Sequence, residues 1–187
     1  AVGFAYLVSY VIPTIDKSNV GIIAVITVAT FTLINIKGVK ETGMTQTVLV
    51  LFLLVLLGMF IFWGFFSRGV GPLELNAPGG FLGVLRASAF IFVVYLGGEA
   101  IAVAQAEIKE PGKTIPRAIL LTCLALILIY TTIAYIIFRV ENITPESLAG
   151  QASPLAYVAE QFMGSIGVGV ITVAGIIAAL SSVNTSI

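Results

Sequence analysis

Hydrophobic positions in this chain are gathered into six long runs, and the breaks between the runs are rich in proline, glycine, asparagine or charge. A helix that crosses a bilayer needs about 20 mostly apolar residues, and breaks of this composition are typical of loops. We therefore predict a set of membrane-spanning helices. Their expected ranges are about 1–12, 20–36, 45–66, 81–106, 115–138 and 163–187.

Both ends of the chain lie inside apolar runs. Ala1 already belongs to the first run, and Ile187 still belongs to the last. The expected organisation is accordingly one transmembrane domain over 1–187 that is truncated at both ends. The predicted fold class is all-α, in the form of a polytopic membrane helix bundle.

Charged loop residues predict the orientation of the helices, because cytoplasmic loops carry an excess of lysine and arginine. If alternate loops face the same side, one set consists of loops 37–44 and 107–117. The basic residues of this set are Lys37, Lys40, Lys109, Lys113 and Arg117. The other three loops hold fewer basic than acidic side chains. We therefore expect loops 37–44 and 107–117 to be cytoplasmic, in a plasma or cytoplasmic membrane.

The break at 139–162 is longer than a plain connector. Thr144 followed by Pro145, and Ser153 followed by Pro154, each resemble an N-cap with proline at the first helical position. We expect one or two short helices here, lying over the outer side of the bundle. They either cap a cavity or form a structured loop without a further role.

Composition narrows the class of protein. Of the 187 residues, 59% are hydrophobic and only 10% are charged, whereas soluble domains carry about a quarter charged residues. The formal net charge is zero, so the chain has no electrostatic footprint for nucleic acid. Histidine is absent, and the apolar runs hold no metal-ligand cluster and no paired carboxylates, so we do not expect an enzyme. The expected surroundings are the lipid bilayer, and the sequence makes no prediction of oligomeric state.

The apolar run 81–106 contains three residues that a simple anchor helix would avoid, namely Gly97, Gly98 and Glu99. Each glycine within a helix costs about 1 kcal/mol relative to alanine, and an acid at bilayer depth costs about 2.5 kcal/mol or more. Their combination predicts a discontinuous helix at 81–106 that opens at mid-membrane and directs polar groups at a bound ligand.

Opening of this helix would leave free carbonyls at the end of one half and free N–H groups at the start of the other. Lipid cannot satisfy these groups, but a zwitterionic ligand can, through its ammonium and its carboxylate. Glu99 then accepts the amine of the substrate or exchanges a proton; the alternative is a structural carboxylate that holds neighbouring helices together. The predicted substrate-binding residues are Val94, Tyr95, Leu96, Gly97, Gly98 and Glu99.

The last apolar run ends with several hydroxyl side chains. Ser181 and Thr185 share one helix face, as do Ser182 and Ser186. Hydroxyls along one face can coordinate a hard cation or a substrate. In the alternative interpretation they bond to their own backbone or to a neighbouring helix.

Several motifs resemble those of the amino acid–polyamine–organocation permeases. The run Tyr95-Leu-Gly-Gly-Glu99 followed by segment 107–118 resembles the broken sixth helix of that family and the start of its seventh. Asn35-Ile-Lys-Gly38, Ser153-Pro154 and the closing segment 179–184 resemble further family motifs, in the same order. The resemblance implies a LeuT-type fold of two five-helix inverted repeats. This chain would then hold the end of helix three through most of helix eight.

The same resemblance implies a secondary active transporter that moves amino acids or related amines by alternating access. Ser181 and Ser182 match a Ser/Thr pair at the cation site of sodium-dependent relatives, so sodium or a proton is the candidate coupling ion and no other cofactor is expected. Two positions depart from the family pattern. Leu53 stands where proton-coupled or exchanging members carry a lysine, which excludes proton coupling through that position. Gly98 stands where a bulkier residue is common, which would enlarge the pocket.

Two alternatives stay open. A permease of the same fold could carry polyamines or nucleobases instead. A channel or a structural membrane protein would belong to a different class, but the sequence shows no pore-lining ring or filter repeat. A passive scaffold would leave the glycines and the acid at 97–99 unexplained.

Overall fold

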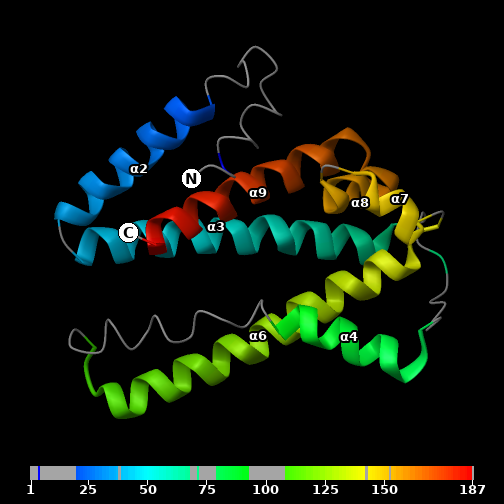
Figure 1. Ribbon diagram of the computed structural model, residues 1–187, viewed down its shortest axis with the longest axis horizontal. Coiled ribbons are helices and arrows are strands. Elements are labelled where there is room, and N and C mark those ends of the chain that lie inside the picture. Colours follow the sequence, from blue (N-terminus) through cyan, green and yellow to red (C-terminus); the bar gives the residue numbers. More distant parts are fainter. Residues whose placement is uncertain are drawn as a thin grey trace. The chain divides into compact units, whose positions relative to one another are not determined.

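Seven helices are defined in the computed structural model, which describes residues 4, 20–37, 39–67, 71, 79–92, 108–141, 143–151 and 153–186 (Figure 1). These residues contain helices and no strand, which confirms the all-α class. The helices are α2 Val20–Lys37, α3 Val39–Phe66, α4 Gly80–Phe92, α6 Pro111–Arg139, α7 Pro145–Ala149, α8 Pro154–Met163 and α9 Ser165–Ser186.

Three of the described helices are long and apolar enough to cross a bilayer. The spans are Thr42–Phe66, Pro111–Arg139 and Ser165–Thr185. Two shorter apolar helices accompany them, at Val20–Ile36 and Gly80–Phe92. The chain is therefore an integral membrane helix bundle, as the hydrophobic pattern predicts.

The long helices α3 and α6 begin earlier than the hydrophobic pattern suggests. Helix α3 starts at Val39 and includes the charged turn that was expected to be a loop up to residue 44. Helix α6 starts at Pro111, because proline fits the first helical position, where its missing N–H is not needed. A helix of 29 residues is about 43 Å long and exceeds the roughly 30 Å hydrocarbon core. Its charged first turns can therefore lie in the headgroup region.

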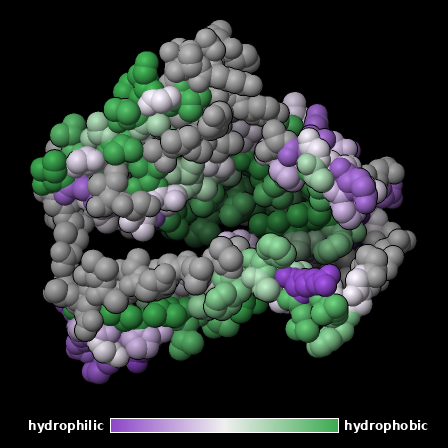
Figure 2. Space-filling model, viewed as in Figure 1, coloured by the Kyte–Doolittle hydropathy of each residue, from purple (hydrophilic) through white to green (hydrophobic). Residues whose placement is uncertain are grey.

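Hydrophilic residues lie mainly near the ends of the helices. Figure 2 shows them around the beginning of α6 and around α7, and one further hydrophilic group lies over α4, which contains Arg86. Most of the remaining helix surface in this view is hydrophobic. This distribution is the one that a bilayer requires, because charged side chains are costly at its centre.

The chain divides into two units, and residues 1–71 and 140–187 form the first. Within this unit α3 and α9 run antiparallel, since Gln46 near the start of α3 contacts Ser181 near the end of α9. Their contact surface, which we call the α3–α9 seam, contains the apolar cluster Leu56, Ala174 and Ile177, with Leu49, Leu53 and Val170 packed against it. The spacing of four and three residues along each helix is that of antiparallel neighbours with interlocking side chains.

Helix α8 packs against α9 and closes one end of the seam. Phe60 is fully buried, and its ring meets Phe162 edge-on with 5.2 Å between the centroids. Gly167 allows the close approach, since a Cβ built there would lie 2.6 Å from Met163 Cβ and 2.7 Å from the Ala159 carbonyl oxygen. The turn between α8 and α9 is made at Gly164, whose φ of 63° suits glycine.

The break at 139–162 contains two short helices, as the proline pattern predicts. Thr144 caps α7 through a reciprocal pair of hydrogen bonds with Ser147, and Pro145 follows at the first helical position. Ser153 precedes α8 without a side-chain cap hydrogen bond. The Thr-Pro signal is therefore confirmed as a cap, whereas the Ser-Pro signal marks only the start of the helix.

The second unit, residues 72–139, contains the described helices α4 and α6. The span of α6 is bounded by positive charge at both ends, with Lys113 and Arg117 near its start and Arg139 at its last residue. The Arg139 guanidinium carbon lies 5.3 Å from the centroid of the Tyr135 ring. Such a pairing lets an aromatic ring and a cation share the membrane boundary.

Candidate functional site

The predicted substrate site at Val94–Glu99 falls outside the described residues. Helix α4 is described from Gly80 to Phe92, and the description resumes at residue 108. The discontinuity in 81–106 therefore stays a prediction.

The second predicted site, at Ser181 and Ser182, lies near the end of α9. The Ser181 hydroxyl accepts a hydrogen bond from Gln46 Nε2 of α3, at 2.7 Å. Ser182 is the next residue along the helix and is more exposed. Because consecutive helical positions are turned by about 100°, the two hydroxyls point in different directions. The structure thus places Ser181 in the α3–α9 seam and Ser182 beside it.

Most other hydroxyls in the described helices behave differently from Ser181. Thr185 Oγ1 donates to the carbonyl of Ser181, one turn earlier, at 2.9 Å. The same bond to the carbonyl four residues earlier is made by Thr27, Thr30, Thr47, Ser88 and Thr132. This is the usual way for a helix to satisfy a hydroxyl away from water. Thr185 therefore follows the backbone-bonded alternative, and the contact of Ser181 across to α3 stands out.

Two amides, the half-buried Gln46 and the buried Asn184, complete the group around Ser181, and the sequence analysis assigns neither of them to a site. Asn184 is 2% exposed, and its Nδ2 donates to Gln46 Oε1 at 3.0 Å and to the Thr42 carbonyl at 3.4 Å. We call Thr42, Gln46, Ser181 and Asn184 the polar layer of the α3–α9 seam. The sequence contains a signal for this layer. One face of the last helix repeats every three or four residues and changes from apolar to polar, at positions 170, 174, 177, 181 and 184.

Helix α2 joins the same group through Asn35. Thr42 Oγ1 donates to Asn35 Oδ1 at 3.1 Å, and Asn35 Nδ2 donates to the Phe31 carbonyl of its own helix at 2.8 Å. Asn35 belongs to the Asn35–Gly38 motif noted in the sequence. Side-chain hydrogen bonds thus connect α2, α3 and α9 close to the beginning of α3.

The polar layer consists of amide, hydroxyl and carbonyl groups, so it offers hydrogen bonds but no acid–base chemistry near neutral pH. Hydrogen bonds between membrane helices contribute about 0.6 kcal/mol each on average, which fixes partners more than it adds stability. Leu53, at the position that the family resemblance associates with a lysine, packs against the apolar cluster of the seam. The described residues include no group of three or more His, Cys, Asp or Glu side chains that could hold a metal ion.

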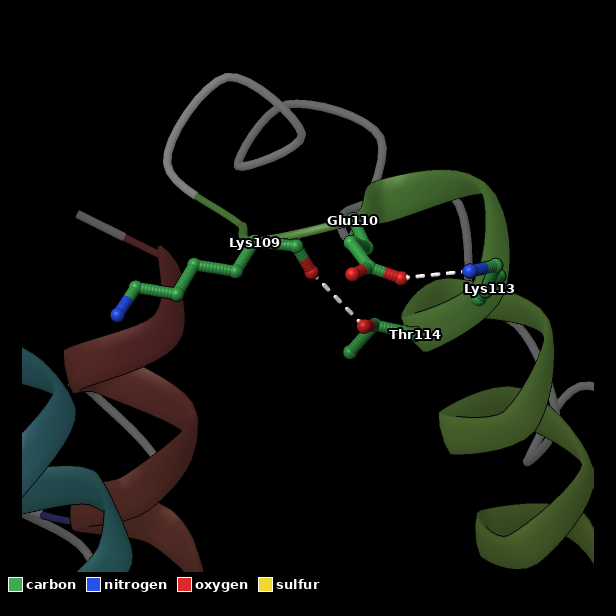
Figure 3. A network of polar contacts seen from close by, with 4 residues as sticks. All are labelled: Lys109, Glu110, Lys113 and Thr114. Atoms are coloured by element: carbon green, nitrogen blue, oxygen red, sulfur yellow. Dashed lines mark hydrogen bonds and ion pairs between the residues drawn. The ribbon is translucent and has the colours of Figure 1, made fainter.

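A charged turn leads into α6 in the second unit (Figure 3). Glu110 has a positive φ of 48°, and its carboxylate pairs with Lys113 Nζ at 2.9 Å. Thr114 Oγ1 donates to the Lys109 carbonyl at 2.9 Å, while the Lys109 side chain extends away from the ion pair. Both charged partners are about 70% exposed, so this is a surface turn that shapes the start of the helix.

The chain matches a family of membrane proteins over its whole length. A family profile described as amino acid permease covers residues 1–187. An uncharacterized protein of Methanocaldococcus jannaschii is 31% identical over 190 residues, which covers all of this chain and 43% of that protein.

Two relatives carry functional names. The chloroplastic cationic amino acid transporter 9 of Arabidopsis thaliana is 29% identical over 74% of this chain and 24% of its own length. The branched-chain amino acid permease of Lactococcus lactis is 26% identical over 78% of this chain and 33% of its own length. The chain thus spans less than half the length of these relatives.

These matches agree with the membrane-spanning helices and with the motifs at 95–99, 107–118 and 179–184, which resemble those of permeases. Together they identify the chain as part of a transporter rather than of an enzyme. The chain belongs to the amino acid permease family.

Proposed function

We propose that the full-length protein is a secondary active transporter that moves amino acids or related amines across the membrane by alternating access. The observation that carries the proposal is the family match over residues 1–187, supported by three helices that can cross a bilayer. The substrate is held at the discontinuous helix of 81–106, by the carbonyl and N–H ends around Gly97 and Gly98. The fold of the whole protein is of the LeuT type, and residues beyond this chain complete the site.

The proposed orientation places segments 37–44 and 107–117 on the cytoplasmic side, because they carry the excess of basic residues. The beginning of α3 and the end of α9 then lie toward the cytoplasm, since these two helices run antiparallel. The polar layer is accordingly in the inner half of the bundle. The charged turn at Glu110 would face the cytoplasm.

Coupling is proposed to involve sodium or a proton. A sodium ion would use the hydroxyls of Ser181 and Ser182, together with ligands from outside this chain. The Ser181 oxygen accepts one hydrogen bond from Gln46 and retains a second lone pair for such a role. A proton would use Glu99, whose neighbourhood lies outside the described residues.

The test is uptake of labelled amino acids by the full-length protein in proteoliposomes, with and without a sodium gradient and a pH gradient. The reduction of labelled uptake by unlabelled lysine, leucine or a polyamine shows which class of substrate is transported. Sodium-driven uptake supports a cation at Ser181 and Ser182, while uptake driven only by pH supports Glu99. If no amino acid or amine is transported, the proposed substrate class is wrong.

Glu99→Gln gives a sharper test of the predicted site. We expect uptake to fall about tenfold, which corresponds to about 1.4 kcal/mol, while the protein level in the membrane is unchanged. The matched control is Glu110→Gln, the same change at an exposed carboxylate of the surface turn, which should leave uptake intact. Equal uptake and pH dependence in Glu99→Gln and the unmodified protein would remove Glu99 from the mechanism.

A further inference from the structure

One atom of the polar layer is not accounted for by the hydrogen bonds described so far. Asn184 is 2% exposed, and its side-chain hydrogen bonds to Gln46 and to Thr42 are both made by Nδ2. Its other polar atom, Oδ1, is enclosed and accepts no hydrogen bond from the described part of the chain. Buried polar side-chain atoms in native proteins are nearly always paired. This oxygen therefore calls for a specific explanation.

The direction of the Asn184 amide is fixed by its neighbours. The Thr42 main-chain carbonyl can only accept, so it requires a donor and must face Nδ2. The orientation of the Gln46 amide matches that of Asn184, since Gln46 Oε1 accepts from Asn184 and Gln46 Nε2 donates to Ser181. Turning the Asn184 amide alone would bring its oxygen against Gln46 Oε1, and turning the Gln46 amide alone would bring two NH2 groups together. Turning both would place Asn184 Oδ1 against the Thr42 carbonyl, which is an acceptor, and would move the unpaired position to Asn184 Nδ2. In each orientation the layer by itself leaves a polar group of Asn184 without a suitable partner.

An unpaired carbonyl in this position would cost about 1–3 kcal/mol. The donor that removes this cost must be small, because the side chain is enclosed between packed helices. It need carry no charge, because the four side chains of the layer are all neutral. Buried waters commonly fulfil this role, making about three hydrogen bonds to polar groups that would otherwise be unpaired.

We propose that Asn184 Oδ1 accepts a hydrogen bond from a single enclosed water molecule, so that the polar layer is a hydrated site between α3 and α9. The same layer contains polar atoms on Thr42, Gln46 and Ser181, which bond to Asn184 Nδ2 or to one another. The proposal does not depend on the identity of the transported substrate. It implies that the two ends of the seam differ in hydration, with a wet layer at Asn184 and a dry cluster at Ala174.

Ala174 supplies the matched control, because it is 3% exposed on the same helix and lies in the apolar cluster of the seam. The measurement is water-edited solid-state NMR of the full-length protein, labelled with ¹³C and ¹⁵N, in lipid vesicles. Magnetisation should pass from water to the Asn184 side chain several times faster than to the Ala174 methyl group. Equal and slow transfer to both residues would overturn the proposal.

A second comparison separates water from a bound cation. The spectra are recorded in sodium and in choline buffer, since choline is too large for an enclosed site. Transfer to Asn184 should be the same in both. If sodium abolishes it, the occupant of the site is the cation and the water assignment is wrong.

A variant provides the last control. Asn184→Leu replaces the acceptor by an apolar side chain and should reduce transfer to the neighbouring Ser181 to the level of Ala174. Undiminished transfer at Ser181 would show that water reaches the layer by another route and would contradict the role of Oδ1. The measurement on the unmodified protein decides the proposal even if this variant does not fold.

Discussion

The two ends of the α3–α9 seam join the same pair of helices through different interactions. At one end Leu56, Ala174 and Ile177 are buried by apolar packing, and at the other end Gln46 and Asn184 are joined by hydrogen bonds. In a bilayer, lipid tails are as apolar as leucine, so packing contributes through close contact rather than through the hydrophobic effect. Apolar contacts tolerate sliding, whereas amide bonds have fixed partners. We therefore expect apolar packing to contribute most of the stability of the seam. The hydrogen bonds of the polar layer should determine how α3 and α9 are aligned along each other.

The largest effect is expected from emptying the packed end. Phe60→Ala removes a fully buried ring that meets Phe162 edge-on, and it should lower the free energy of unfolding by about 3 kcal/mol. Chemical unfolding of the full-length protein in detergent micelles measures the change. Phe62→Ala, at a ring that is 63% exposed, is the control and should cost far less. Similar losses in both variants would show that burial of Phe60 is not what stabilises this end.

The next largest effect concerns the close approach of α8 to α9. Gly167→Ala places a methyl group against Met163 and the Ala159 carbonyl and should cost about 2 kcal/mol through overpacking. Gly169→Ala is the matched control, because a Cβ there meets nothing within 4 Å. Thermal unfolding of the two variants compares them directly. If Gly167→Ala is as stable as Gly169→Ala, the contact between the two helices is looser than described.

The polar layer should show a smaller but coupled effect. Asn184→Ala and Gln46→Ala each remove the bond between the two amides, and we expect each to cost about 1 kcal/mol. The double variant should cost less than the sum of the single ones, because each single change leaves an unpaired group behind.

A double-mutant cycle on unfolding in micelles gives the coupling energy. Thr185→Ala serves as the reference, since its hydroxyl is exposed and bonds within α9. Strict additivity of Gln46→Ala and Asn184→Ala would mean that the two amides do not act as one unit.

The smallest effect is expected outside the membrane-spanning parts. Glu110→Gln removes the ion pair with Lys113, whose partners are both about 70% exposed, and should change the free energy of unfolding by less than about 0.5 kcal/mol. High salt should make even this difference vanish. A loss comparable to that of Asn184→Ala would reverse the proposed ranking of buried and exposed polar contacts.

Patterns within one segment were sufficient to predict much of the fold. The apolar lengths identified the spans in α3, α6 and α9, and Thr144 followed by proline identified the start of α7. The beginning of α3 was placed too late, because Lys40 and Glu41 are good helix formers that the apolar pattern assigns to a loop.

The polar layer could not be predicted in the same way. Gln46 and Ser181 are 135 residues apart, and the sequence does not say which helix faces which. A polar residue at a seam position looks the same whether it meets lipid, its own backbone or another helix. Ser181 bonds to a neighbouring helix and Thr185 to its own backbone, which are the two forms of the second alternative given for these hydroxyls. The site at Val94–Glu99 stays a prediction, since it rests on residues outside the described part.

The Thr42 carbonyl that orients Asn184 belongs to the main chain, so no substitution at position 42 removes it as an acceptor. Only the side chains that bond around this carbonyl, at positions 46 and 184, can be changed by substitution. Positions 46 and 184 should therefore vary together among related permeases, either as two amides or as two apolar residues. A homologue with an amide at 184 and leucine at 46 would carry an amide with one bond fewer. We therefore expect substitutions at positions 46 and 184 to occur together.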